Sequence, residues 1–233
     1  MTPDDLRARL IAVAAQPPNA AAVRGDDVRA ARGDEVRTKY GDEVRAKYGD
    51  DDRAEHGDDI RAALDRPLVP AAVLVPVILG DKPGVLLTKR TPHLKAHAGQ
   101  VSFPGGRIDP EDRGPEDAAL REAWEEIGLD RALVEVLGRL DDYATGTGYR
   151  ITPVLSLIPP NLEYRPSADE VESVFELPMT VLLDPDAPRL QRQHVRGEWR
   201  EYWVWPHPDH YIWGATAAIL VHLAERLRRG HSR

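Results

Sequence analysis

The alternation of apolar and polar residues divides the chain into a short helix, a polar middle and a long globular part. Leu6, Leu10 and Val13 recur at helical spacing, which predicts a short amphipathic helix over residues 3–15. From about Pro67 onward, apolar stretches bounded by Gly, Pro and Asp predict strands at 68–79, 84–89, 101–103, 133–140, 151–158, 201–205 and 211–213. The same part is expected to hold helices at 115–127, 178–183 and 215–228.

An eight-residue repeat lies between the first helix and the globular part. A Gly-Asp pair begins each unit, with its glycine at 25, 33, 41, 49 and 57. Successive units rotate by roughly 80° on a helix of 3.6 residues per turn, so their small aliphatic residues form no straight apolar stripe. The sequence therefore predicts a helix and linker over 1–23, a polar segment over 24–61 and a domain over 66–233. The polar segment is expected to be disordered or an exposed helix, and a partner-binding arm is the functional alternative.

Three glutamates on the expected helix at 115–127 are the main candidates for chemistry. Glu122, Glu125 and Glu126 stand at i, i+3 and i+4, so their carboxylates share one face of the helix. Such neighbours repel each other, and a hard divalent cation removes that repulsion. Mg²⁺ is usually held by a few carboxylates together with substrate phosphate oxygens. The alternative is a solvated acidic face, which is what most acidic clusters are.

Two features beside these glutamates favour a functional site. Gly105 and Gly106 allow the backbone to approach a ligand or the helix closely. Arg121 can clamp a carboxylate with two parallel hydrogen bonds. The apolar residues of the helix form two stripes, made up of Ala119, Ala123 and Ile127 and of Leu120 and Trp124.

These residues resemble the signature of the Nudix hydrolases. That signature runs glycine, five residues, glutamate, seven residues, and then Arg-Glu-aliphatic-any-Glu-Glu-any-Gly-aliphatic. Gly106 and residues 121–129 fit it, with Ala123 as a weak aliphatic position. Asp112 stands where the signature has glutamate, and eight residues rather than seven separate it from Arg121. The resemblance implies an α/β fold, the Nudix α/β/α sandwich with a mixed sheet between helices.

A narrower resemblance accounts for the unusual spacing. Residues 86–91 and 97–106 are similar to the extended motif of coenzyme A pyrophosphatases, which carry Asp at positions like 109 and 112. Further similar stretches are 147–154, 169–171, 175–178 and 211–217. The resemblance implies hydrolysis of coenzyme A or its derivatives to 3′,5′-ADP and 4′-phosphopantetheine. Two alternatives stay open, namely a Nudix pyrophosphatase for ADP-ribose, dinucleotides or nucleoside triphosphates, and a catalytically inactive domain that binds nucleotides.

The resemblance also implies roles for individual residues. Mg²⁺ or Mn²⁺ is expected at Glu125 and Glu126, with Glu122 at or beside the metal and a backbone carbonyl from Gly106. The expected catalytic residues also include Arg121, which is expected to orient carboxylates. Glu170 is expected to be a further metal ligand or a general base, and the alternative is an ordinary surface acid. The residues expected to bind substrate are Arg90, Lys95, His97 and Gly105. Asp109 and Asp112 either assist metal binding or shape the turn, and the tryptophans at 203, 205 and 213 suit the core better than base stacking.

Composition limits the possible settings. The chain has 233 residues, enough for one domain with a full core, and no cysteine, which excludes disulfides and thiolate metal sites. A net charge of −8 argues against nonspecific nucleic-acid binding. No signal peptide and no apolar run long enough to cross a membrane is evident. We therefore expect a cytoplasmic protein without nucleic-acid or membrane partners, and with a homodimer as one option for its assembly.

Overall fold

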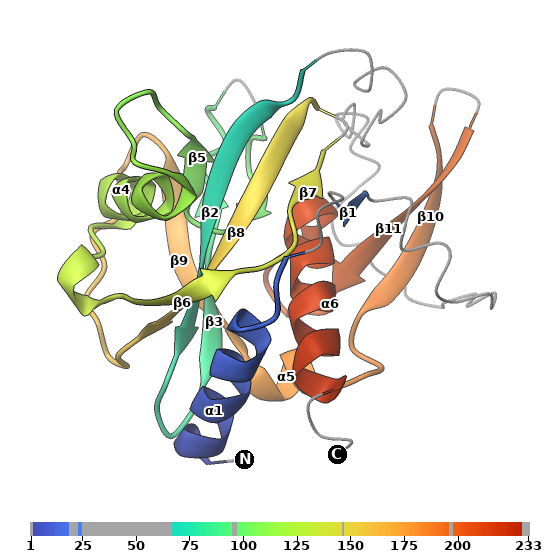
Figure 1. Cartoon of the computed structure of the whole chain (residues 1–233). Helices are drawn as coiled ribbons and strands as arrows, with labels where there is room; N and C mark the ends of the chain where they lie inside the picture. The colour runs from blue at the N-terminus through green and yellow to red at the C-terminus, as the bar shows by residue number, and fades with distance from the viewer. Residues whose placement is uncertain are drawn as a thin grey trace.

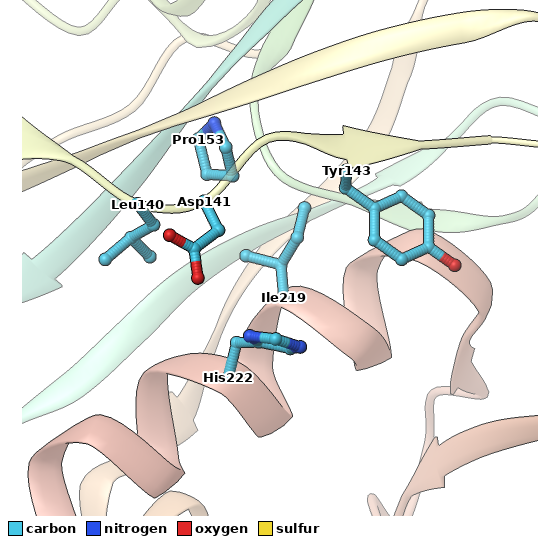
Figure 2. Close-up of a pocket in the computed structure, with 6 residues that line it drawn as sticks. All are labelled: Leu140, Asp141, Tyr143, Pro153, Ile219 and His222. Atoms are coloured by element: carbon cyan, nitrogen blue, oxygen red, sulfur yellow. The ribbon is translucent and has the colours of Figure 1, made fainter. Parts of the chain in front are cut away.

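A mixed sheet with helices on both faces forms the framework of the molecule (Figure 1). The computed structural model describes residues 2–18, 23–24, 67–94, 97–145, 147–195 and 198–229, without the side chains of 23, 24 and 193–200. The central strand β2 (Val69–Ile78) pairs in parallel with β8 (Tyr149–Ile158) and antiparallel with β3 (Gly84–Arg90) and β5 (Gly105–Arg107). Because β2 is covered on both faces, its sequence reads as a nearly continuous apolar run.

Shorter strands complete this sheet on either side of β2. Its order is β1-β7-β8-β2-β3-β4, with β5 on β2, β6 on β8 and β9 on β3. The bounds of the remaining strands are β1 Val23–Arg24, β4 Val101–Ser102, β6 Glu135–Arg139, β7 Tyr143–Ala144 and β9 Val171–Pro178.

The helices divide the core into two layers. On one face α4 (Pro115–Ile127) packs against β2, and Leu74, Leu86 and Ile127 belong to the core between them. On the other face lie α6 (Gly214–Arg229), α5 (Met179–Leu183) and α1 (Pro3–Ala14), as Figure 1 shows. This arrangement confirms the expected α/β/α sandwich with a mixed sheet.

A second, antiparallel sheet lies against α6 and consists of β10 (Arg189–Val195), β11 (Glu198–Trp205) and β12 (Ile212–Trp213). Trp203 and Trp205 of β11 are buried, and the indole N–H of Trp205 donates to the carbonyl of Ala217. These two tryptophans therefore serve the core, as the sequence favoured.

Several strands were not expected from the sequence, and the start of one expected strand was misplaced. No strand was expected at residues 105–107, yet they pair with β2 as β5. The strand expected from 133 begins at Glu135, because the side chain of Asp130 accepts from the N–H of Ala132 and stabilises a 3-10 turn at Arg131–Leu133. The other strands without a sequence expectation are β1, β7, β9 and β10.

The N-terminal helix belongs to the same packed unit as the rest of the described chain. Thr2 and Asp5 form a reciprocal capping box at its start. Its apolar face buries Leu6, Leu10 and Val13 in the core layer that also contains α6. After the helix, β1 pairs with β7 through Val23 and Arg24. The expectations for 24–61 lie outside the described residues, apart from Arg24.

If α1 is integral to the domain, truncating its buried face lowers stability. Leu10→Ala should lower the free energy of unfolding by about 2–5 kcal/mol, because it leaves a cavity in a closed core. Ile11→Ala is the matched control, since Ile11 is 45% exposed on the same helix and should change stability by less than about 0.5 kcal/mol. Urea unfolding of both variants gives the comparison, and equal midpoints would contradict the packing of α1.

Candidate active site

The helix α4 fixes the direction in which its glutamates point. Pro115 occupies the first helical turn, and Gly128 ends the helix in a left-handed conformation with φ 67°. Ala119, Ala123 and Ile127 are buried, as expected from one apolar stripe. In the expected second stripe Leu120 packs against the same core, whereas Trp124 is 58% exposed.

Glu126 is a carboxylate almost completely removed from water. It is 2% exposed, accepts a hydrogen bond from the N–H of Gly105 at 3.2 Å and lies 3.5 Å from Nη1 of Arg90. Burial raises the pKa of Glu126 to about 8; Arg90 and the Gly105 N–H oppose the rise, while Glu122 and Glu170 add to it. Arg90 and the N–H of Gly105 therefore offset only part of the cost of burying a negative charge at Glu126.

Glu122 shares this environment. Burial is also the main cause that raises the pKa of Glu122, with Arg121 opposing and the carboxylates of Glu125 and Glu170 adding to the rise. Gly106 makes room for this side chain, because a Cβ at that position would lie 2.3 Å from Oε1 of Glu122. The glycine is thus required by the close approach of strand and helix.

Arg121 uses every N–H of its guanidinium. Nε and Nη2 donate to the two carboxylate oxygens of Asp112 at 3.0 and 2.9 Å, and Nη2 also donates to the carbonyl of Arg107 at 3.1 Å. Nη1 donates to Glu122 at 3.0 Å and to Glu125 at 3.1 Å. A guanidinium has five such donors, so this residue is fully committed to orienting its neighbours.

Asp112 is therefore best understood as the residue that holds Arg121. Besides the two bonds from the guanidinium, it accepts from the N–H of Asp109 at 2.8 Å and shapes that turn. The hydrogen bonds from Arg121 are the main cause that lowers the pKa of Asp112. The carboxylate of Asp109 lies farther out, 3.5 Å from Arg121 and 54% exposed. Of the two roles left open by the sequence, the structure favours turn formation for both residues.

The hydrogen-bond ladder of β5 decides which carbonyl faces the glutamates. Flanking bonds run from Leu74 N–H to Pro104 O and from Ile108 N–H to Pro70 O. Because ladder bonds alternate along an antiparallel pair, the N–H and C=O of Gly106 both turn toward β2. The polar backbone groups of Gly105 point the other way, where its N–H reaches Glu126. A backbone ligand expected at Gly106 is therefore better placed at Gly105.

Glu170 reaches the cluster through a loop tied to the end of α4. The N–H groups of Arg165 and Ser167 donate to the carbonyls of Ile127 and Glu126, both at 2.8 Å. The carbonyl of Glu170 accepts from Thr91 N–H at the end of β3. Its negative charge contributes to the raised pKa of both Glu122 and Glu126, which places the side chain in their neighbourhood.

The expected substrate-binding residues differ in their placement. Arg90 faces Glu126, and its buried Nε has no hydrogen-bond partner within the part of the chain that is described. His97 is exposed in a tight turn with φ 57°, where its Nδ1 lies 3.0 Å from Oε1 of Gln100. Gly105 contributes its N–H to Glu126. Lys95 lies outside the described residues.

The donor set suits Mg²⁺ or Mn²⁺, which prefer carboxylate and carbonyl oxygens. The negative charge of Glu170 adds to the raised pKa of both Glu122 and Glu126, and a bound cation would offset this accumulation of negative charge. Within the described ranges no three acidic or histidine side chains converge closely enough to hold an ion as they stand. Nη1 of Arg121 donates to both Glu122 and Glu125, and the side chain of Glu125 is 54% exposed.

Comparison with known proteins assigns the family. Residues 68–211 match the Nudix domain family. The chain belongs to this family. NudL of Escherichia coli K12, an uncharacterized Nudix hydrolase, is 45% identical over 159 residues, which cover 66% of this chain and 80% of that protein. Helix α4 is accordingly the Nudix helix of this chain.

Solved Nudix structures show more distant likenesses. The MutT protein of Methanosarcina mazei is 15% identical with a TM-score of 0.48, over 72% of this chain and 99% of that one. The Nudix domain of Shewanella oneidensis NrtR, solved with ADP-ribose, is 19% identical with a TM-score of 0.45, over 83% and 98% of the two chains. Because both scores lie below 0.5, neither likeness bears on function.

No helix in the described ranges is long and apolar enough to cross a membrane.

Some contacts that shape the Nudix site could not be expected from the sequence. The pairing of Asp112 with Arg121 had a weak signal, since an arginine fork close to an aspartate invites bidentate bonding. The backbone bonds that tie Arg165 and Ser167 to the end of α4 had none. The contact of Arg107 with Tyr149 joins the end of β5 to the stretch at 147–154, and it had no signal in the sequence.

We expect Asp112→Ala to release Arg121 and loosen the site. Breaking a hydrogen-bonded pair of charged groups should lower the free energy of unfolding by about 1–3 kcal/mol and reduce the rate of hydrolysis. Asp109→Ala provides the control, because its exposed carboxylate makes only a 3.5 Å contact with Arg121. Urea unfolding and initial rates measure both effects, and equal losses in the two variants would show that Asp112 has no special role.

Proposed function

We propose that this Nudix protein is a divalent-metal-dependent pyrophosphohydrolase that cleaves the diphosphate bond of coenzyme A or its derivatives. The observation that carries the reaction type is the carboxylate pair of the buried Glu126 and the partly buried Glu122, held beside Gly105 and Gly106 and supplemented by Glu170. The substrate is supported by the similarity of residues 86–106 and of the later motifs to coenzyme A pyrophosphatases.

Glu122, Glu125 and Glu126, with the outward carbonyl of Gly105, would hold Mg²⁺ or Mn²⁺. Such an ion neutralises the diphosphate charge and lowers the pKa of a bound water. Arg121 keeps Glu122 and Glu125 in position, and Asp112 keeps Arg121 in position. Each of these side chains is thus oriented before substrate arrives, which reduces the reorganisation required during reaction.

The remaining residues act on water and substrate. Glu170 is exposed, and its charge acts on Glu122 and Glu126, which supports a role as the base that accepts the proton of the attacking water. The oxygen of that water forms a bond to phosphorus as the bridging P–O bond breaks. With coenzyme A the products are 3′,5′-ADP and 4′-phosphopantetheine. Arg90 has an unused buried Nε that is suited to a substrate phosphate oxygen.

Hydrolysis is expected to need added Mg²⁺ or Mn²⁺ and to collapse in Glu126→Gln. The amide has nearly the same shape but is a poorer ligand for a hard cation, so a loss of several orders of magnitude in kcat is expected. Glu111→Gln serves as the control, because Glu111 is an exposed acid outside the cluster. The rates are followed by separation of products, with chelator added in parallel. Near-normal, chelator-resistant turnover by Glu126→Gln would disprove the assignment of the site.

Coenzyme A should be a better substrate than ADP-ribose. The reason is the resemblance in residues 86–106, which is specific to coenzyme A pyrophosphatases. The ratio of kcat/KM for the two compounds under the same metal conditions is the appropriate measure. An equal or higher value for ADP-ribose would leave the proposed diphosphate chemistry intact and reject the proposed substrate.

A further inference from the structure

Arg107 is an arginine beside the site whose guanidinium is held by a tyrosine rather than by a carboxylate. Its Nη2 donates to the hydroxyl of Tyr149 at 2.9 Å, and its guanidinium carbon lies 5.6 Å from the centre of the Tyr149 ring. Within the described ranges no ion pair joins Arg107 to a carboxylate, although the charge of Asp109 acts on it from nearby. By contrast, an acidic partner lies within 4.0 Å of each of Arg113, Arg121, Arg131, Arg139 and Arg150.

The position of Arg107 connects it to the catalytic residues. It directly follows Gly106 in β5, about 3.8 Å away along the chain. Its backbone carbonyl accepts from Arg121, which also holds Glu122 and Glu125. The backbone at Arg107 is therefore fixed by the same network that orients the glutamates.

The side chain of Arg107 leaves the strand on the face opposite Glu122. Arg107 pairs with Ala71 and Tyr149 pairs with Val69, so the two side chains lie on one face of the sheet, with β2 between them. Gly106, whose open side admits Glu122, belongs to the other face. The N–H and C=O of Gly105 point away from β2 in the plane of the sheet, so they form an edge between the two faces. A substrate bound at that edge would reach the guanidinium by passing around the edge of β5 to the other face of the sheet.

The remaining hydrogen-bond donors of Arg107 suit a phosphate group. A guanidinium has five N–H donors, and in the described part of the chain Tyr149 receives only one hydrogen bond from it. Arginine binds phosphate through two parallel hydrogen bonds, which gives direction as well as charge. The contact with Tyr149 holds the fork in place and lowers the entropy lost when an anion binds.

We propose that Arg107, oriented by Tyr149, binds a phosphomonoester of the substrate, which in coenzyme A is the 3′-phosphate. This assignment rests on the proposed function, because the diphosphate is then occupied at the carboxylate cluster and the 3′-phosphate is the remaining anionic group. Arg107 is accordingly a specificity residue, which distinguishes coenzyme A from 3′-dephospho-coenzyme A.

The test compares hydrolysis of these two compounds by the full chain and by three variants. Arg107→Gln should lower the ratio of kcat/KM for coenzyme A over 3′-dephospho-coenzyme A about ten-fold, mainly through KM. Tyr149→Phe should shift the ratio in the same direction by a smaller factor, since it removes only the hydroxyl that orients the guanidinium. Arg113→Gln, an equal loss of charge at an arginine paired with Asp117, should leave the ratio unchanged.

Two results would overturn the proposal while leaving the proposed function in place. One is an equal effect of Arg107→Gln on both substrates, and the other is the same shift in Arg113→Gln, which would indicate a general effect of charge. If the wild-type protein cleaves neither compound, the proposed function fails, and calorimetry with 3′,5′-ADP and 5′-AMP decides the role of Arg107. Tighter binding of 3′,5′-ADP that Arg107→Gln abolishes supports that role, whereas equal affinity for the two nucleotides refutes it.

Discussion

The burial of carboxylates beside one another is the constraint on which this structure depends. Removing a single charged carboxylate from water is unfavourable, and a second one nearby makes it more so. Glu126 and Glu122 lie in this situation, and the raised pKa of each reflects it. The surrounding fold opposes the effect with directed donors, namely the N–H of Gly105 and the guanidinium groups of Arg90 and Arg121. A site of this kind is poised to attract a cation.

The parts that the sequence predicted well are those in which local pattern and tertiary contacts agree. Helix α4 has a proline at its start, a glycine at its end and a buried alanine face, so its bounds follow from its own residues. The same is true of β2, whose apolar run suits a strand covered on both faces. The placement of Glu122, Glu125 and Glu126 on one face of the helix also follows from helical spacing alone.

The parts that the sequence missed depend on partners distant in the chain. Gly105 and Gly106 are residues typical of a turn. They pair with β2 as a strand because glycine lets the two backbones approach closely. Trp124 reads as a core residue by its type, yet no element covers its face of α4 in the described chain. The direction of the Gly106 carbonyl depends on ladder register, which local sequence does not specify. The role of Asp112 depends on its two hydrogen bonds from Arg121, a residue nine positions away whose other donors are taken by different partners.

The loop that carries Glu170 makes use of a property common to every helix. The last carbonyls of a helix have no partner within it, and here two of them accept from Arg165 and Ser167. Because these two bonds fix residues 165 and 167 against α4, the position of Glu170 depends on the number of residues that follow them. Insertions or deletions within residues 166–169 would displace Glu170 even if every side chain were retained. Segments before the anchors, such as the surface turn at 159–162, can change length without moving it, so tolerance to length variation should change abruptly at Arg165.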